Sequence, residues 1–199
     1  MVGDRSYEKF AEKADTAYRQ SPEGTTSDEE CAYQEEYGIL LNWFGTRKRE
    51  ADWNADLVRL AGLAVYGWMP RMLRVYGKEA GSNGIDSKDD FQPIADALNH
   101  NKWNDVAGNF LNRSYVGTSK FLHFAWPDEY AIWDSNVHKA LDWPSVTNSK
   151  LNFETYQRHM RKFCSDMKKS LREVEVALFR EGKKLKVAEA AQKRSSELR

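Results

Sequence analysis

The residues most suited to chemistry lie between positions 117 and 138. An amine and a carboxylate, Lys120 and Asp134, stand fourteen positions apart, and Pro127 begins the link between them. A carboxylate stabilises positive charge that develops on a reacting carbon, and an unprotonated amine can attack that carbon. Because about two helical turns and a short link separate the two side chains, we expect both to face one cleft.

The segment around Lys120 has the pattern of two helices joined by a tight turn. Gly117 allows a close backbone approach at the turn, and the exposed amides at the start of the second helix are suited to a phosphate. We expect Lys120 in the first turn of that helix, where the helix dipole disfavours a cation, so a carboxylate such as Asp134 or a phosphate should lie nearby. The residues that we expect to contact a phosphate backbone are Arg113, Gly117, Thr118, Ser119, Asn136 and His138.

Aromatic side chains make up 13% of the chain and include seven Trp. Such rings either fill a core or offer flat faces for stacking. The candidates for a stacking pocket are Trp43, Trp68, Tyr115, Trp126 and Trp133. Trp133 directly precedes Asp134, and the alternation of an extended segment points its ring away from that carboxylate.

Each candidate also has a purely structural interpretation. Asp is a favoured N-cap, so Asp134 can cap the helix that follows it, and capping and catalysis can coexist in one residue. Lys120 can lie on the surface with its stem over Phe124. His123 and His138 fit structural histidines better than metal ligands, and we assign neither a metal nor a cofactor.

The composition indicates a soluble, intracellular protein with a local rather than a global charge pattern. Thirty basic residues balance thirty acidic ones, so no overall positive field attracts a polyanion. Basic residues predominate from Arg158 to Lys186, which permits a basic face, whereas positions 21–36 are acidic. Cys31 and Cys164 form no C-x-x-C motif, which excludes a cysteine-rich metal site and favours a reducing cytoplasm. No stretch approaches the roughly 18 apolar residues that span a bilayer.

Apolar spacing predicts an all-α protein with one domain over residues 1–191 and a frayed polar tail at 192–199. Gly45 is expected to end the second helix, Pro70 to kink the third, and Gly182 to break the C-terminal helical span. The expected helices before the motif cover residues 4–20, 28–44, 51–76, about 90–98 and 103–111, and Asp89 or Asp90 is expected to cap the fourth of them. Further helices are expected after Gly117 and after Asp134, and two more within 153–191.

Two short motifs resemble the helix-hairpin-helix DNA glycosylases. Val116–Lys120 is similar to the end of the family's hairpin, and Ile132–Val137 is similar to the turn that carries its aspartate. The nearest likeness is to the 8-oxoguanine glycosylase-like branch, including bacterial members with a Gly-Thr-Lys-Phe-Leu-type helix before an Asp-Ser-x-Val turn. The resemblance implies that Asp134 is the required carboxylate and that Lys120 is the nucleophile of members that also cut the strand. The hairpin here has one glycine, and one extra residue separates Gly117 from Lys120.

The resemblance implies an enzyme that flips a modified base out of the DNA stack and excises it, leaving an abasic site. The base would be an oxidised purine or a bulky phage-type pyrimidine such as glucosylated hydroxymethylcytosine, the latter in phage defence. Either Asp134 positions a water or Lys120 attacks the sugar, and of these we favour the water. We expect a cytoplasmic monomer that binds double-stranded DNA and no membrane. The alternatives are a DNA-binding module without catalysis and a helical protein-interaction domain, neither of which predicts new abasic sites.

Overall fold

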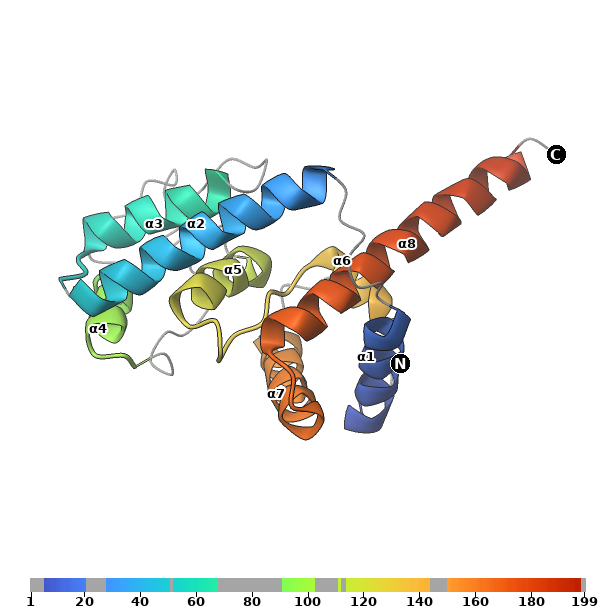
Figure 1. Ribbon diagram of the computed structural model, residues 1–199, viewed down its shortest axis with the longest axis horizontal. Helices are drawn as coiled ribbons and strands as arrows, with labels where there is room; N and C mark the ends of the chain where they lie inside the picture. Colours follow the sequence, from blue (N-terminus) through green and yellow to red (C-terminus); the bar gives the residue numbers. More distant parts are fainter. Residues whose placement is uncertain are drawn as a thin grey trace, which may run out of the picture. The chain divides into compact units, whose positions relative to one another are not determined.

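The computed structural model is all-helical (Figure 1), which confirms the fold class expected from the sequence. It describes residues 6–20, 28–50, 52–67, 91–102, 111, 114–143 and 150–197, with the backbone alone for 28–33 and 197. Within these ranges there are eight helices and no strand. The helices are α1 (Tyr7–Gln20), α2 (Asp28–Glu50), α3 (Ala55–Gly67), α4 (Gln92–Asn99), α5 (Tyr115–Ala125), α6 (Ser135–Ala140), α7 (Lys150–Met167) and α8 (Leu171–Glu197).

The helices form two compact units. The α1/α6–α8 unit contains α1, α6, α7 and α8, and the α2–α5 unit contains α2, α3, α4 and α5. The chain passes from the α2–α5 unit to the other between Tyr130 and Ala131. A single domain over residues 1–191 stays a prediction. None of the described helices is both long and apolar enough to cross a bilayer.

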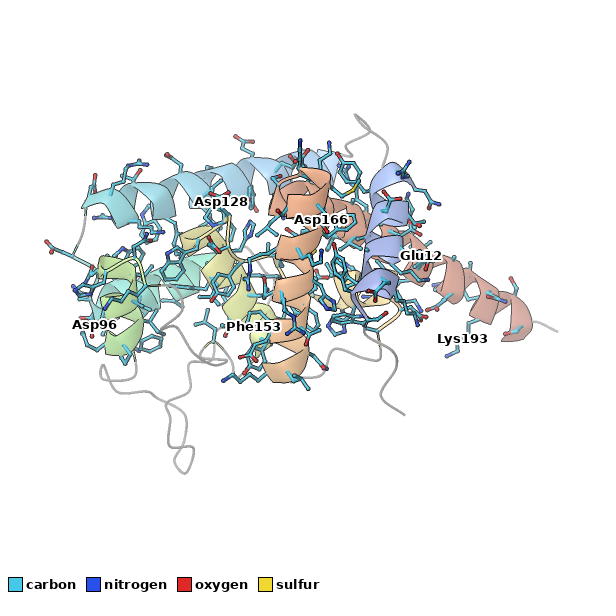
Figure 2. The ribbon with its side chains drawn as sticks, turned by 90° about the horizontal axis from the view of Figure 1, so that it is seen from below. Glu12, Asp96, Asp128, Phe153, Asp166 and Lys193 are labelled. Carbon is cyan, nitrogen blue, oxygen red and sulfur yellow. The ribbon has the colours of Figure 1, made fainter. Side chains whose placement is uncertain are left out.

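The core of the α1/α6–α8 unit is aromatic. Phe10 of α1 meets the rings of Tyr156 and Phe163 on α7, and Trp133 lies 4.7 Å from Tyr156 between ring centroids. All four rings are buried, and burying one such side chain contributes about 1.5–3 kcal/mol to stability. Figure 2 shows α7, with Phe153 and Asp166 labelled, beside α1. The remaining helix, α8, packs along α1, α6 and α7.

The two C-terminal helices break between Lys168 and Ser170, so the break expected near Gly182 is wrong. Lys168 has a φ of 53°, a left-handed conformation that ends α7. Ser170 then begins α8 with a capping box, because its Oγ accepts from the Glu173 amide and the Glu173 carboxylate accepts from the Ser170 amide. Residues 192–197 continue α8, and fraying of this end stays a prediction.

In the α2–α5 unit, α5 is the central helix. Every residue of α5 except Val116 is buried, and α5 packs against α2 and α3. The Phe44 ring of α2 lies 5.3 Å from that of Phe121 and 5.8 Å from that of Phe124 between centroids. A helix that is buried on all sides presents little of its surface to a ligand.

Several boundaries in this unit differ from the sequence prediction. α2 continues through Gly45 to Glu50, because a single glycine is tolerated inside a packed helix. α5 begins at Tyr115 after the N-cap Ser114, so Gly117 lies in its first turn and not between two helices. α3 leaves Leu60 58% exposed, although this residue lies at helical spacing with the buried Ala61 and Val65. Outside the described residues lie Asp89, Asp90, Pro70 and residues 103–110, with the caps, kink and helix predicted there.

Candidate active site

Asp134 is the N-cap of α6. Its backbone is extended, with φ −144° and ψ 177°, and its Oδ1 accepts hydrogen bonds from the amides of Asn136 and Val137 at 2.7 and 2.9 Å. The structural interpretation of this aspartate as a cap is therefore confirmed. Its Oδ2 accepts no hydrogen bond from the described residues, and the residue is partly exposed. One carboxylate oxygen is thus fixed by the fold, and the other has no hydrogen-bond donor among the described residues.

Two side chains of α7 hold the segment that precedes Asp134. The Gln157 amide accepts from the Ala131 nitrogen at 2.9 Å and donates to the Ala131 oxygen at 2.8 Å. The Tyr156 hydroxyl donates to the Ile132 oxygen at 2.9 Å. Because both side chains are buried, water does not compete for these bonds.

The helix α8 holds the other side of the same turn. Gly182 lies so close to α6 that an added Cβ would be 2.5 Å from the carbonyl carbon of Asn136. One turn further along α8, the Lys186 ammonium donates to the Ser135 hydroxyl at 2.8 Å. Contacts from α7 and α8 therefore hold the residues on both sides of Asp134.

The charge of Asp134 also acts on the interior of its unit. The pKa of Tyr156 is raised well above 10.0, first by burial and then by the charges of Glu175 and Asp134. The phenol therefore stays protonated across the physiological range and keeps donating to the Ile132 oxygen. In this way the buried hydrogen bond that orients the turn is protected from ionisation.

The residues beside Asp134 belong largely to the core. Trp133 is fully buried and His138 is 3% exposed, with their ring centroids 3.8 Å apart. Trp133 is fully buried and Asp134 is partly exposed, and the direction of the Trp133 ring away from the carboxylate stays a prediction. A flipped base could stack on Trp133 only if this core opened. Asn136, another predicted DNA contact, is partly exposed on α6.

Lys120 lies in the α2–α5 unit and Asp134 in the other, so their pairing in one cleft stays a prediction. Lys120 is the sixth residue of α5 and thus lies in its second turn, whereas the sequence placed it in the first. It is only 9% exposed, so the alternative of a solvated surface lysine is wrong. Burying an ammonium is costly unless it is paired, and Lys120 does have an interaction partner in the protein.

The residues expected to meet phosphate at the start of α5 contact the protein itself. Thr118 Oγ1 accepts from the Leu111 amide at 3.3 Å, and Ser119 Oγ donates to the Val116 oxygen at 2.9 Å. Both residues are fully buried. Gly117 provides room for the Tyr66 phenol of α3, whose Cζ would lie 2.9 Å from an added Cβ. The close approach expected at this glycine therefore exists, and its partner is an aromatic side chain.

The aromatic candidates differ in accessibility. Trp126 is 3% exposed, donates from Nε1 to Asn101, and has the Lys48 ammonium 5.0 Å above its ring. Tyr115 is buried at the first position of α5, whereas Trp43 keeps part of its surface exposed on α2. Outside the described residues lie Trp68 and Arg113.

His123 is a structural histidine. Its Nδ1 donates to the Tyr130 oxygen at 2.6 Å, and its Nε2 accepts from the Tyr37 hydroxyl at 2.8 Å. The side chain is fully buried, so these two bonds satisfy both ring nitrogens. Across the described ranges, no three His, Cys, Asp or Glu residues cluster in a way that could hold a metal ion.

The residues that position Asp134 were not predicted from the sequence. Gln157 had a visible signal, because its amide lies among the apolar residues Phe153, Tyr156 and Met160 at helical spacing, and a buried amide needs partners. Gly182 had a weaker signal, because a glycine inside a helix can mark either a break or a close contact. Which of the two it marks depends on the neighbouring helix.

No protein-family model, curated protein or solved structure matches this chain. The likeness to helix-hairpin-helix DNA glycosylases therefore rests on the two motifs around Gly117 and Asp134.

Proposed function

We propose that the protein is a DNA glycosylase whose catalytic carboxylate is Asp134. The observation that carries the proposal is that the two oxygens of this carboxylate differ: Oδ1 caps a helix, and Oδ2 accepts no hydrogen bond from a described residue. A charge held in place by the fold needs no reorganisation when positive charge develops on a substrate, which is the main source of electrostatic catalysis. This supports a role for Asp134 in the reaction as well as in the fold.

The proposed reaction is hydrolysis of the bond between base and deoxyribose. As that bond breaks, its electron pair leaves with the base and positive charge develops on the sugar, where Oδ2 of Asp134 stabilises it. The same oxygen orients a water molecule toward the anomeric carbon. The water oxygen bonds to that carbon, the departing base gains a proton, and an abasic site remains.

The substrate is proposed to be either an oxidised purine or a bulky modified pyrimidine such as glucosylated hydroxymethylcytosine. The second would make the enzyme part of a defence against phages with modified genomes. Both require the target base to leave the stack, which costs a few kcal/mol and is the step at which a modified base can be selected. Duplexes of both classes are therefore needed in one panel.

The test is excision on that panel, followed by alkaline cleavage of the abasic product. Asp134→Asn should abolish strand breaks at the one modified base that is attacked. Because Asn caps helices about as well as Asp, the fold should persist and the loss can be assigned to the missing charge. Asp142→Asn is the matched control, since Asp142 is exposed at a positive φ that Asn also adopts. Absence of cleavage on every duplex, with DNA affinity unchanged in Asp134→Asn, would leave a binding module instead.

Lys120→Ala separates the two chemical routes. If Lys120 is the nucleophile, the variant loses both excision and the covalent adduct that borohydride traps from the wild-type protein. If water is the nucleophile, excision continues and neither protein is trapped. Because Lys120 is buried, the melting temperature of the variant is measured beside its activity.

A further inference from the structure

The helix α8 brings an ammonium group next to the candidate carboxylate. Gly182 allows the backbone of α8 to touch Asn136, and Lys186 follows four residues later on the same face of the helix. Its Nζ lies 2.8 Å from the hydroxyl of Ser135, the residue directly after Asp134. The last turns of α8, where Lys193 is labelled, extend beyond the other helices of the unit (Figures 1 and 2).

Lys186 differs from Lys139 and Lys184 in the kind of group to which its ammonium donates. Lys139 on α6 is paired with Glu189, and Lys184 on α8 is paired with Glu181. Lys186 bonds a neutral hydroxyl instead, and no carboxylate of the described residues pairs with it. Lys183, three residues before it on the same face, is exposed and likewise makes no ion pair with a described residue. Two lysines on this face of α8 therefore have no ion-pair partner among the residues that the structure describes.

We propose that Lys186 and Lys183 bind a backbone phosphate of the DNA strand whose target sugar faces Asp134. The inference rests on the proposed function, because that function places a sugar at this carboxylate. A sugar in a DNA strand always has phosphates on both sides, and a lysine ammonium is a point charge that binds phosphate without reading sequence. Binding of the strand also requires phosphate contacts from other residues, because Thr118 and Ser119, which were predicted to contact phosphate, are buried.

The experiment measures binding of the full chain to fluorescein-labelled duplexes, unmodified or with one tetrahydrofuran abasic analogue, by anisotropy at several salt concentrations. Each phosphate contact contributes about 0.9 to the slope of log affinity against log salt, so losing one costs about eightfold in affinity near 0.1 M salt. Lys186→Gln should lower the salt slope by about 0.9 and weaken the affinity about eightfold near 0.1 M salt. Lys186→Arg keeps the charge and should keep most of the affinity.

The matched control is Lys184→Gln, which removes the same charge from the same helix. Lys184 is two residues from Lys186 and points away from its face, and its charge is already paired with Glu181. Equal effects of Lys184→Gln and Lys186→Gln, or no effect of either, would overturn the inference. Both side chains are largely solvent-exposed, so each variant should keep its stability within about 0.5 kcal/mol.

The outcomes also distinguish this inference from the proposed function. If Asp134→Asn abolishes excision while Lys186→Gln leaves the affinity and its salt slope unchanged, the glycosylase function is supported and the proposed phosphate site is wrong. If no base is excised from any duplex but Lys186→Gln weakens binding with the expected change in salt slope, the phosphate site is supported and the proposed glycosylase function is wrong. Failure of the wild-type chain to bind either duplex overturns both.

Discussion

The substitution Gly182→Ala tests the contact that positions both Asp134 and Lys186. An alanine Cβ at position 182 would lie 2.5 Å from the Asn136 carbonyl carbon, 2.8 Å from its Cα, and closer still to its oxygen. Ordinary contacts begin at 3.4 Å, so α6 and α8 must separate by at least 0.9 Å at this point. The obstructing atoms are backbone, which cannot rotate away as a side chain would.

Two opposing effects set the size of the change. Replacing Gly by Ala inside a helix stabilises it by about 1 kcal/mol when nothing else changes. Overpacking of a close contact costs about 1–3 kcal/mol. Because backbone is displaced here, we take the upper part of that range and expect Gly182→Ala to destabilise the protein by about 1–2 kcal/mol net.

The assay is urea unfolding followed by circular dichroism, with Gly38→Ala as the control. Gly38 is exposed within α2 and has nothing within 4 Å of an added Cβ, so the same substitution there should stabilise the protein. The two variants should therefore change the unfolding free energy in opposite directions. DNA affinity should also fall in Gly182→Ala, because the shift moves Lys186 away from Ser135. If Gly182→Ala stabilises the protein as Gly38→Ala does, the close packing of α8 on α6 is incorrect.

Two further predictions concern the α1/α6–α8 unit. Burial, and then the charge of Arg158, lower the pKa of His159 below 6.5. The neutral ring therefore stabilises the fold above pH 6.5, and this contribution is lost as the pH falls from 6.5 through the lowered pKa. His159→Phe should make the urea midpoint of unfolding depend less on pH across this range, and an equal pH dependence in both proteins would contradict the prediction. Ser170→Ala removes the hydroxyl that caps α8 and bonds Glu173, and should lower the free energy of unfolding in urea by about 1 kcal/mol. A decrease below about 0.3 kcal/mol would mean that α8 is capped without the Ser170 side chain.

The double role proposed for Asp134 requires that capping and catalysis do not compete for the same oxygen. An N-cap aspartate uses one oxygen for the first amides of its helix, and those bonds hold the side chain in one rotamer. The second oxygen is then held in a fixed direction, although no described residue donates a hydrogen bond to it. Asp134→Ser would keep a cap and remove the charge, so it should match Asp134→Asn in stability and in lost activity.

The sequence was sufficient for features that depend on neighbouring residues. The helical class follows from apolar spacing. The alternative of Asp134 as a cap followed from the preference for Asp, Ser and Asn at the start of an apolar segment, where they satisfy free amides locally. Each of these depends on geometry within a few residues, which the chain itself determines.

Only the tertiary structure decided features that depend on another helix. Gly182 permits a close crossing with α6 and does not break α8, and Gly117 makes room for Tyr66 and does not form a turn. Lys186 stands beside Ser135 although fifty-one positions separate them in the chain. No local pattern specifies such a distance, because a glycine or lysine has the same local signature whether or not a second backbone lies against it.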